Sequence, residues 1–170
     1  MEPFESMIRQ HYPAVYNFLL RLCDYRSDIA EELAQDVFLQ AYMAVADFQG
    51  KCSMKTWLIQ IAKNTFYMYL RKNKHAAVSF ETLPTEPVDT AAEFPDNELY
   101  TRELLARARL IIDGMQPHMR DVLLYRIYTD LPYAQISVLL SVSESSAKVL
   151  FHRGKSILRK KLKEEYGYEI

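Results

Sequence analysis

Apolar residues recur every three or four positions along most of the chain, which is the spacing of one face of an α-helix. This spacing predicts one or two helices over residues 4–23, with Pro13 near a helix start. It also predicts an amphipathic helix capped by Asp28, and a longer helix over residues 54–72 capped by Ser53. The alternation typical of strands is nearly absent, so the sequence predicts an all-α fold.

The helix that follows Asp28 has an apolar and a polar side. The polar side on its own is that of an ordinary solvated helix face, and it carries Glu31, Glu32, Gln35, Asp36 and Gln40. The apolar side predicts the buried residues Ile29, Leu33, Val37, Ala41 and Val45, with Phe38 and Tyr42 widening the stripe.

Cations and aromatic residues gather on the helix over residues 54–72 and on the loop before it. Such a mixture suits single-stranded nucleic acid, where aromatic rings stack on bases and cations follow the backbone. A small domain also needs aromatic residues in its core, so the core is the preferred place for Trp57, Phe66 and Tyr69. Phe48, on the loop, is the freer candidate for stacking.

Residues 75–98 differ in character from the rest of the chain. They contain six acidic residues, three prolines and no lysine or arginine, and the helical spacing disappears. We therefore expect an extended acidic linker between two small helical domains, residues 1–74 and 99–170.

The second domain is predicted to contain helices over residues 99–112 and 118–128, the latter with Arg120 and Arg126 outward. Two more helices over residues 131–163 are joined by a short turn. Ser143 is placed to cap the last helix, and Gly154 permits close packing on its inner face. The outer face carries Ser145, Lys148, Val149, His152 and Arg153. This layout is that of a DNA-binding helix-turn-helix.

Charge separates DNA binding from the alternative, a helical hairpin with a basic solvated face. Residues 144–163 hold seven basic residues, Lys155 among them, and one acid, for a net charge of +6. The whole chain carries −1. Such a strongly basic segment in a nearly neutral protein indicates a surface for phosphates.

Composition narrows the class of protein further. Hydrophobic residues at 49% and charged residues at 25% are typical of a folded globular protein. We expect a cytoplasmic protein, because the first residues lack the pattern of a signal peptide and no apolar run approaches the roughly 18 residues that span a bilayer. Cys23 and Cys52 are expected to be reduced structural thiols, with a redox-sensing pair as the alternative. The histidines are scattered (His11, His75, His118 and His152), which argues against an enzyme, a metal site or a cofactor.

Three segments in this order resemble the extracytoplasmic-function (group IV) sigma factors of the sigma-70 family. AEELAQDVFLQAY (residues 30–42) resembles the helix that binds the clamp of RNA polymerase. DFQGKCSMKTWLIQIAKNTFYMYLRK (residues 47–72) resembles the region 2 segment that captures the melted −10 promoter element. Residues 115–162 resemble region 4, which reads the −35 element.

The resemblance implies a promoter-specificity subunit with no catalytic chemistry of its own. Its partners would be core polymerase (clamp and flap), promoter DNA, both duplex and melted non-template strand, and an anti-sigma factor, with no direct membrane insertion. The implied −10 contacts are Phe48 and Asn64 around a flipped base, with Lys51, Lys63 and Arg71 along its backbone. The −35 set is Arg126, Ser145, Lys148, Val149, His152, Arg153 and Lys155. The polymerase-binding set is Glu32, Gln35, Asp36 and Leu39.

The chain departs from the family pattern at several positions. Met68 stands where the family usually has aspartate and Leu150 where it often has arginine, while Ser137 and Ser141 replace the usual alanine and glycine. The promoter sequence therefore does not follow from the resemblance. Two other classes were weighed: a plain helix-turn-helix regulator, which would need no second DNA-facing domain, and a protein–protein adaptor, which would leave the basic helix unexplained.

Overall fold

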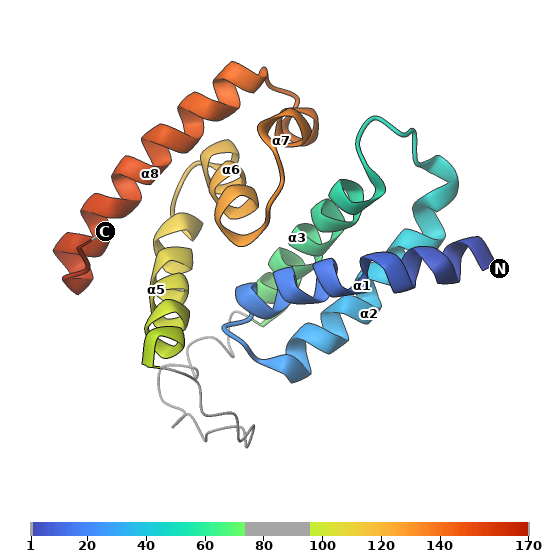
Figure 1. Cartoon of the computed structure of the whole chain (residues 1–170), viewed down its shortest axis with the longest axis horizontal. Coiled ribbons are helices and arrows are strands. Elements are labelled where there is room, and N and C mark those ends of the chain that lie inside the picture. The colour runs from blue at the N-terminus through green and yellow to red at the C-terminus, as the bar shows by residue number, and fades with distance from the viewer. Residues whose placement is uncertain (1, 74–95, 170) are drawn as a thin grey trace.

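The computed structural model describes residues 2–73 and 96–169, and these residues form helices with no strand. The all-α fold is thus confirmed (Figure 1). The first unit contains α1 (Glu2–Leu22), α2 (Ser27–Ala44), the 3₁₀ turn η1 (Val45–Asp47) and α3 (Met54–Lys72). The second contains α5 (Asp96–Asp113), α6 (Pro117–Tyr128), α7 (Tyr133–Leu140) and α8 (Glu144–Tyr166).

The predicted acidic linker, residues 75–98, lies almost wholly outside the described residues. Its last three residues already belong to α5, which therefore begins three residues before the predicted position 99. The domain limits 1–74 and 99–170 stay predictions.

In the first unit, α1, α2 and α3 pack pairwise around a shared apolar core. Of the predicted stripe, Leu33, Val37 and Ala41 are buried, whereas Ile29 and Val45 are only half-buried. Ser53 caps α3, its Oγ accepting a hydrogen bond from the backbone N–H of Thr56 at 3.1 Å. This side-chain hydrogen bond fixes the start of the helix, so α3 begins where the sequence predicted.

Two predicted boundaries in the first unit are wrong. α2 begins at Ser27 with Arg26 in the N-cap position and no side-chain cap, so Asp28 lies inside the first turn. There its carboxylate faces the positive end of the helix dipole, which is a favourable place for an acid although not a cap. Pro13 lies in the middle of the continuous helix α1. Met7 before it and Val15 after it are both buried, and this packing holds the helix together across the missing backbone N–H.

The second unit is arranged around α6, which contacts α5, α7 and α8. Ser141 ends α7 in the left-handed conformation, with φ of 53°. Ser143 then caps α8, its Oγ accepting from the N–H of Ser146 at 3.0 Å, as predicted. Gly154 is buried and lets α8 approach α6 closely. The helix-turn-helix is thus present, and α8 forms the outer side of the molecule (Figure 1).

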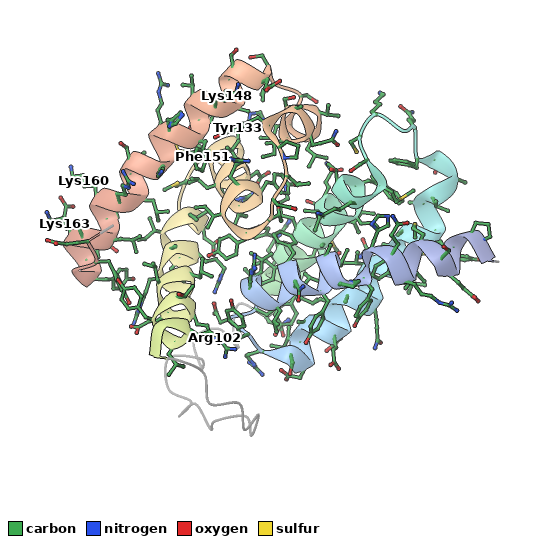
Figure 2. All side chains as sticks on the ribbon, viewed as in Figure 1. Arg102, Tyr133, Lys148, Phe151, Lys160 and Lys163 are labelled. Atoms are coloured by element: carbon green, nitrogen blue, oxygen red, sulfur yellow. The ribbon has the colours of Figure 1, made fainter. Side chains whose placement is uncertain are left out.

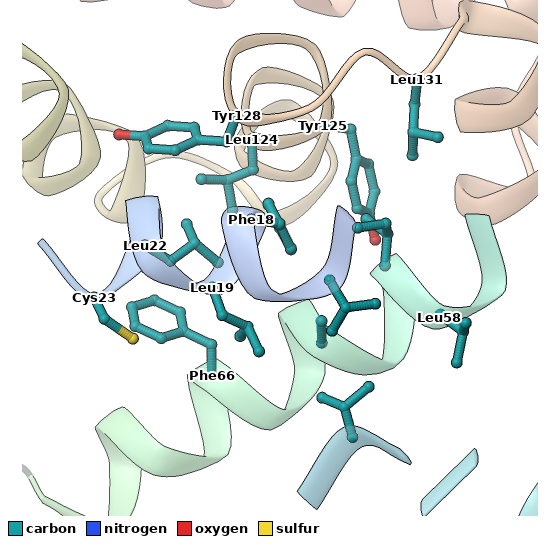
Figure 3. Packing of buried hydrophobic residues seen from close by; sticks show 14 of the residues in the cluster. Phe18, Leu19, Leu22, Cys23, Leu58, Phe66, Leu124, Tyr125, Tyr128 and Leu131 are labelled. Carbon is teal, nitrogen blue, oxygen red and sulfur yellow. The ribbon is translucent and has the colours of Figure 1, made fainter. Parts of the chain in front are cut away.

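The two units pack directly against each other. Leu124, Tyr125 and Tyr128 of α6 are fully buried, and Figure 3 shows Leu124 next to Phe18 of α1 and the ring of Tyr125 directed toward α3. One continuous hydrophobic core therefore runs through the described residues of both units.

Candidate nucleic-acid interface

The outer face of α8 carries the residues predicted to meet duplex DNA. The cap at Ser143 sets the start of the helix, and the 3.6-residue repeat then directs the following side chains to one side. All of the predicted residues on this helix are exposed: Ser145, Lys148, Val149, His152, Arg153 and Lys155. Lys148 also pairs with Glu144, one turn earlier, at 3.5 Å. This face therefore presents exposed cations and polar groups around one exposed apolar residue, Val149.

Tyr133 and Phe151 form an aromatic pair between the basic side chains at the start of this face, where α7 meets α8 (Figure 2). Their rings lie edge to face with centroids 6.0 Å apart. The Lys148 ammonium lies 5.8 Å from the Tyr133 ring centroid, and the Lys155 ammonium 5.9 Å from that of Phe151. Cations held over ring faces are attracted by the ring quadrupole, so the aromatic pair steadies both lysines. Tyr133 was expected only on the apolar stripe of α7, and its spacing alone contained no sign of this contact.

Arg126 lies beneath the aromatic pair rather than pointing outward as predicted. Its guanidinium is 4.4 Å from the Tyr133 ring centroid and 5.8 Å from that of Phe151. Its Nη1 donates to the carbonyl oxygen of Leu131 at 3.1 Å. Arg120 is also half-buried, because it lies 4.5 Å from the ring of Tyr67 in the other unit. The neighbouring rings draw both guanidiniums inward, an attraction that helical spacing does not report.

The predicted −10 residues divide into two groups in the structure. Lys51, Asn64 and Arg71 are exposed. Phe48 is half-buried, and its ring lies on Trp57 with centroids 5.0 Å apart and planes tilted by 40°. Trp57 thus supports the Phe48 ring from one side.

Lys63 differs from the other predicted −10 residues because it is buried, with 8% of its surface exposed. Its Nζ lies 2.7 Å from Oδ2 of Asp121 on α6 and 5.6 Å from the ring centroid of Tyr125. In this arrangement its charge is directed at the second unit.

The predicted polymerase-binding residues of α2 lie on an open helix face. Glu32, Gln35, Asp36 and Leu39 are all exposed. Tyr42 was predicted to widen the buried stripe, and this is wrong: it is 61% exposed, and its ring lies edge to face with that of Phe4, with centroids 5.1 Å apart. Met43, which the sequence reading did not single out, is 68% exposed. Both follow Leu39 by three or four residues, so an apolar strip extends the predicted face along one side of the helix.

Neither cysteine is in a disulfide. Cys23 is buried at the end of α1, and burial raises the pKa of its thiol to about 12. Cys52 is half-buried on the loop before α3. In the part of the chain that the structure describes, no group of three His, Cys, Asp or Glu residues could hold a metal ion. Within the same residues, no helix has the length and apolar character needed to cross a bilayer.

Family comparisons match both units in order. Sigma-70 region 2 matches residues 7–76, and sigma-70 region 4 matches residues 105–158. The chain is 27% identical over 161 residues to the RNA polymerase sigma factor YlaC of Bacillus subtilis (strain 168), covering 95% of this chain and 92% of that one. It is 26% identical over 155 residues to the ECF RNA polymerase sigma factor SigM of the same organism, covering 91% and 92%.

Solved structures share the fold. The chain resembles the sigma factor RpoE in its complex with the anti-sigma factor NepR from Bartonella quintana, with a TM-score of 0.64, 19% identity and coverage of 97% and 99%. It also resembles CnrH in complex with the cytosolic domain of CnrY, with a TM-score of 0.63, 15% identity and coverage of 95% and 88%.

Proposed function

The chain belongs to the extracytoplasmic-function group of the sigma-70 family, and we propose how its described surfaces divide the work of promoter recognition. As a sigma factor it directs core RNA polymerase to promoters and initiates transcription there. It would carry no catalytic chemistry of its own, since polymerisation belongs to the core enzyme.

One observation carries the assignment of roles. A helix-turn-helix with an exposed basic face and an α2–α3 unit with a second set of exposed polar and aromatic groups lie in the same short chain. A plain regulator needs only the first of these. Two differently built faces suit a protein that meets DNA in two forms and a polymerase besides.

The outer face of α8 would read the −35 element as duplex. Lys148, Arg153 and Lys155 are exposed cations and would contact phosphates, while the exposed Val149 and His152 would contact base edges in the major groove. Ser145 lies near the helix start, where a hydroxyl and free backbone N–H groups suit a phosphate oxygen. Arg126 would support this face through the Tyr133–Phe151 pair, since its own guanidinium is held inward.

The loop before α3 and the exposed side of that helix would hold the −10 element once it is melted. Phe48, backed by Trp57, would stack on an extruded base, and Asn64 would hydrogen-bond to it. Lys51 and Arg71 would follow the backbone. Lys63 belongs to the same proposed set, although Asp121 covers it in the described arrangement.

Glu32, Gln35, Asp36 and Leu39 would bind the polymerase clamp, and the second unit would bind the flap. An anti-sigma factor is a further proposed partner, because the similar structures contain sigma factors bound to NepR and to the cytosolic domain of CnrY. All of these partners, and the chain itself, would meet in the cytoplasm.

Run-off transcription tests the proposal directly. The purified chain would be added to core polymerase of Bacillus subtilis, the organism of two of its relatives, on a library of promoter-containing genomic fragments. We expect new transcripts that share a pair of upstream elements and vanish without the chain. The proposal would be overturned if the chain produced no transcript with a core polymerase that is still active with its own sigma factors.

DNA binding by the isolated chain distinguishes a sigma factor from a plain helix-turn-helix regulator. A single small helix-turn-helix has few base-reading side chains, so the isolated chain should bind promoter duplex far more weakly than the roughly 10⁻⁸ M of specific regulators. Selective binding should appear only with core polymerase. Tight sequence-specific binding of the isolated chain in a mobility-shift assay would favour the regulator.

A further inference from the structure

A buried ion pair joins the two units. The Nζ of Lys63 on α3 lies 2.7 Å from Oδ2 of Asp121 on α6, and only 10% and 9% of the two side chains are exposed. The other carboxylate oxygen of Asp121 accepts from Nε of Arg120 at 2.9 Å. If one partner is removed while the units stay together, the other charge is left buried and unpaired, which is strongly unfavourable.

Further polar contacts surround this pair. The hydroxyl of Tyr67 on α3 donates to Asp113 on α5 at 2.7 Å. At the end of α1, Asp24 pairs with Arg109 of α5 at 3.2 Å. On the other side, Lys55 pairs with Asp130 at 2.8 Å, and the backbone N–H of Ser53 donates to Oε1 of Gln135 on α7 at 3.0 Å.

The junction has features of a surface that also exists apart. Tyr125 is fully buried, yet its hydroxyl has no hydrogen-bond partner within the described residues, and Figure 3 shows that end of the ring directed toward α3. Water would satisfy this hydroxyl if the units separated. A crevice of about 380 Å³ also opens between α1 and α6, beside Lys55 and Asp130. The junction thus combines apolar contacts with ion pairs and an unpaired hydroxyl, and such polar groups are typical of interfaces between domains that move relative to each other.

The junction covers part of the proposed −10 face and leaves the proposed polymerase-binding face of α2 exposed. Lys63 is in the proposed −10 set, and Gln135 holds the backbone at the end of the loop that carries Phe48 and Lys51. The clamp-binding residues of α2, in contrast, stay exposed. In this arrangement the chain can offer α2 to the polymerase while Lys63 cannot reach a phosphate.

We propose that the Lys63–Asp121 ion pair is an intramolecular latch, in which Asp121 takes the place of a promoter phosphate and holds the free chain closed. This inference rests on the proposed function in one respect only, namely that a promoter phosphate replaces Asp121 as the partner of Lys63. Lys63 then has two mutually exclusive partners. Separation of the units exposes it to melted DNA, and closure withdraws it.

The first test measures the distance between the units in the chain alone. Donor and acceptor dyes are placed at Ser27→Cys and Glu164→Cys, two exposed positions in different units, in a Cys52→Ser background. Asp121→Asn removes the charge while keeping the shape of the side chain, so energy transfer should fall and the radius of gyration from X-ray scattering should rise. The charge exchange Lys63→Asp with Asp121→Lys should restore the closed values. Unchanged energy transfer in Asp121→Asn would overturn the latch.

Two further variants keep this result interpretable. Glu103→Gln is the matched control, because it removes one acidic charge and one ion pair from the same unit, although that pair, with Arg107, stays within α5. It should leave energy transfer unchanged. Lys63→Gln breaks the latch from the other unit, and it decides the question by the same measurement if circular dichroism shows that Asp121→Asn has lost helix.

The second test asks whether closure withholds Lys63 from DNA. A fluorescent single-stranded oligonucleotide of mixed sequence serves as the probe, and its affinity is measured at several salt concentrations. Asp121→Asn should bind more tightly than Glu103→Gln, by a factor set by the small open fraction of the wild-type chain. Its salt slope should also increase by about one phosphate contact. Equal affinity and slope in the two variants would overturn the DNA half of the latch.

These outcomes separate the latch from the proposed function. The distance measurement uses neither polymerase nor promoter, so its failure would leave the sigma activity standing. Absence of transcription with the wild-type chain would contradict the proposed function but would not affect the conclusion that the two units are closed in the free chain.

Discussion

Gly154 of α8 faces Leu123 of α6 so closely that a Cβ at position 154 would lie 2.7 Å from Leu123 Cδ1 and 3.0 Å from Met119 Cγ. Leu123 is fully buried and has little room to move. The absence of a side chain at this position therefore sets how near α8 comes to α6, and with it the position of the DNA-facing side of α8.

Gly154→Ala should destabilise the protein. Overpacking a filled core costs about 1–3 kcal/mol, against up to about 1 kcal/mol gained from alanine as a better helix former. The midpoint of urea unfolding should fall, whereas the exposed control Ser156→Ala should leave it nearly unchanged. In a Leu123→Ala background the cost of Gly154→Ala should disappear. An equal cost in both backgrounds would mean that the contact with Leu123 is not its source.

Ser141→Gly should stabilise the helix-turn-helix. Ser141 holds φ of 53°, which costs a residue with a Cβ about 1–2 kcal/mol relative to glycine, while glycine loses part of that gain in the unfolded chain. We expect a net gain of about 0.5–1 kcal/mol and a rise of the melting temperature of about 2–4 °C per kcal/mol. Ser141→Ala, which keeps the Cβ, should bring no gain. A lower melting temperature for the glycine variant would contradict this reasoning.

The two DNA faces should act at different steps of initiation. Phe48→Ala and Asn64→Ala should cripple promoter opening and leave closed complexes near normal, because base stacking is worth roughly 1–3 kcal/mol only once a base is extruded. Lys148→Ala and Arg153→Ala should weaken closed complexes and lower the salt slope by about one unit each.

Permanganate footprinting of unpaired thymines measures opening, and filter binding at several salt concentrations measures the closed complex. Phe48 also packs on Trp57, so a structural effect must be separated from base capture. If Phe48→Ala weakened closed complexes as much as opening, Phe48 would belong to the core of its unit and not to base capture.

The exposed face of α2 should be required for polymerase association. Gln35→Ala combined with Asp36→Lys should abolish co-purification with core enzyme, with no change in helix content, because both side chains are exposed and support no packing. The matched control is Glu164→Lys, a charge reversal at an exposed position on α8. Wild-type yield of core enzyme with the double variant would refute the assignment of this face.

Cys23 should not react with thiol reagents while the protein is folded. Thiol reagents attack the thiolate, and burial raises the pKa of Cys23 to about 12, so almost none is present at pH 8. Cys52 is less buried and should react first. Titration with Ellman's reagent should show one accessible thiol, and a second only after unfolding in urea. Rapid reaction of both thiols in the folded state would revive the redox-sensing alternative.

Helix positions and caps followed from the sequence because their causes are local. Ser53 and Ser143 each accept a hydrogen bond from a backbone N–H three residues later, which requires no knowledge of the rest of the fold. The same holds for the exposed face of α8, since the repeat of 3.6 residues directs its side chains as soon as the start of the helix is known. The family resemblance added roles to these positions, and roles cannot be read from periodicity.

Only the tertiary structure shows whether the side chains of Lys63, Arg126 and Tyr42 are buried or exposed. Periodicity states on which side of its own helix a residue lies, but not which other element covers that side. Asp121, 58 positions away in sequence, buries Lys63, and the rings of Tyr133 and Phe151 hold Arg126 inward. Tyr42 contacts Phe4 at the start of α1 but stays 61% exposed, so an aromatic residue that fits a buried stripe is left largely in solvent. Long-range contacts of this kind depend on how two units dock, and the pattern along one helix contains no information about its distant neighbour.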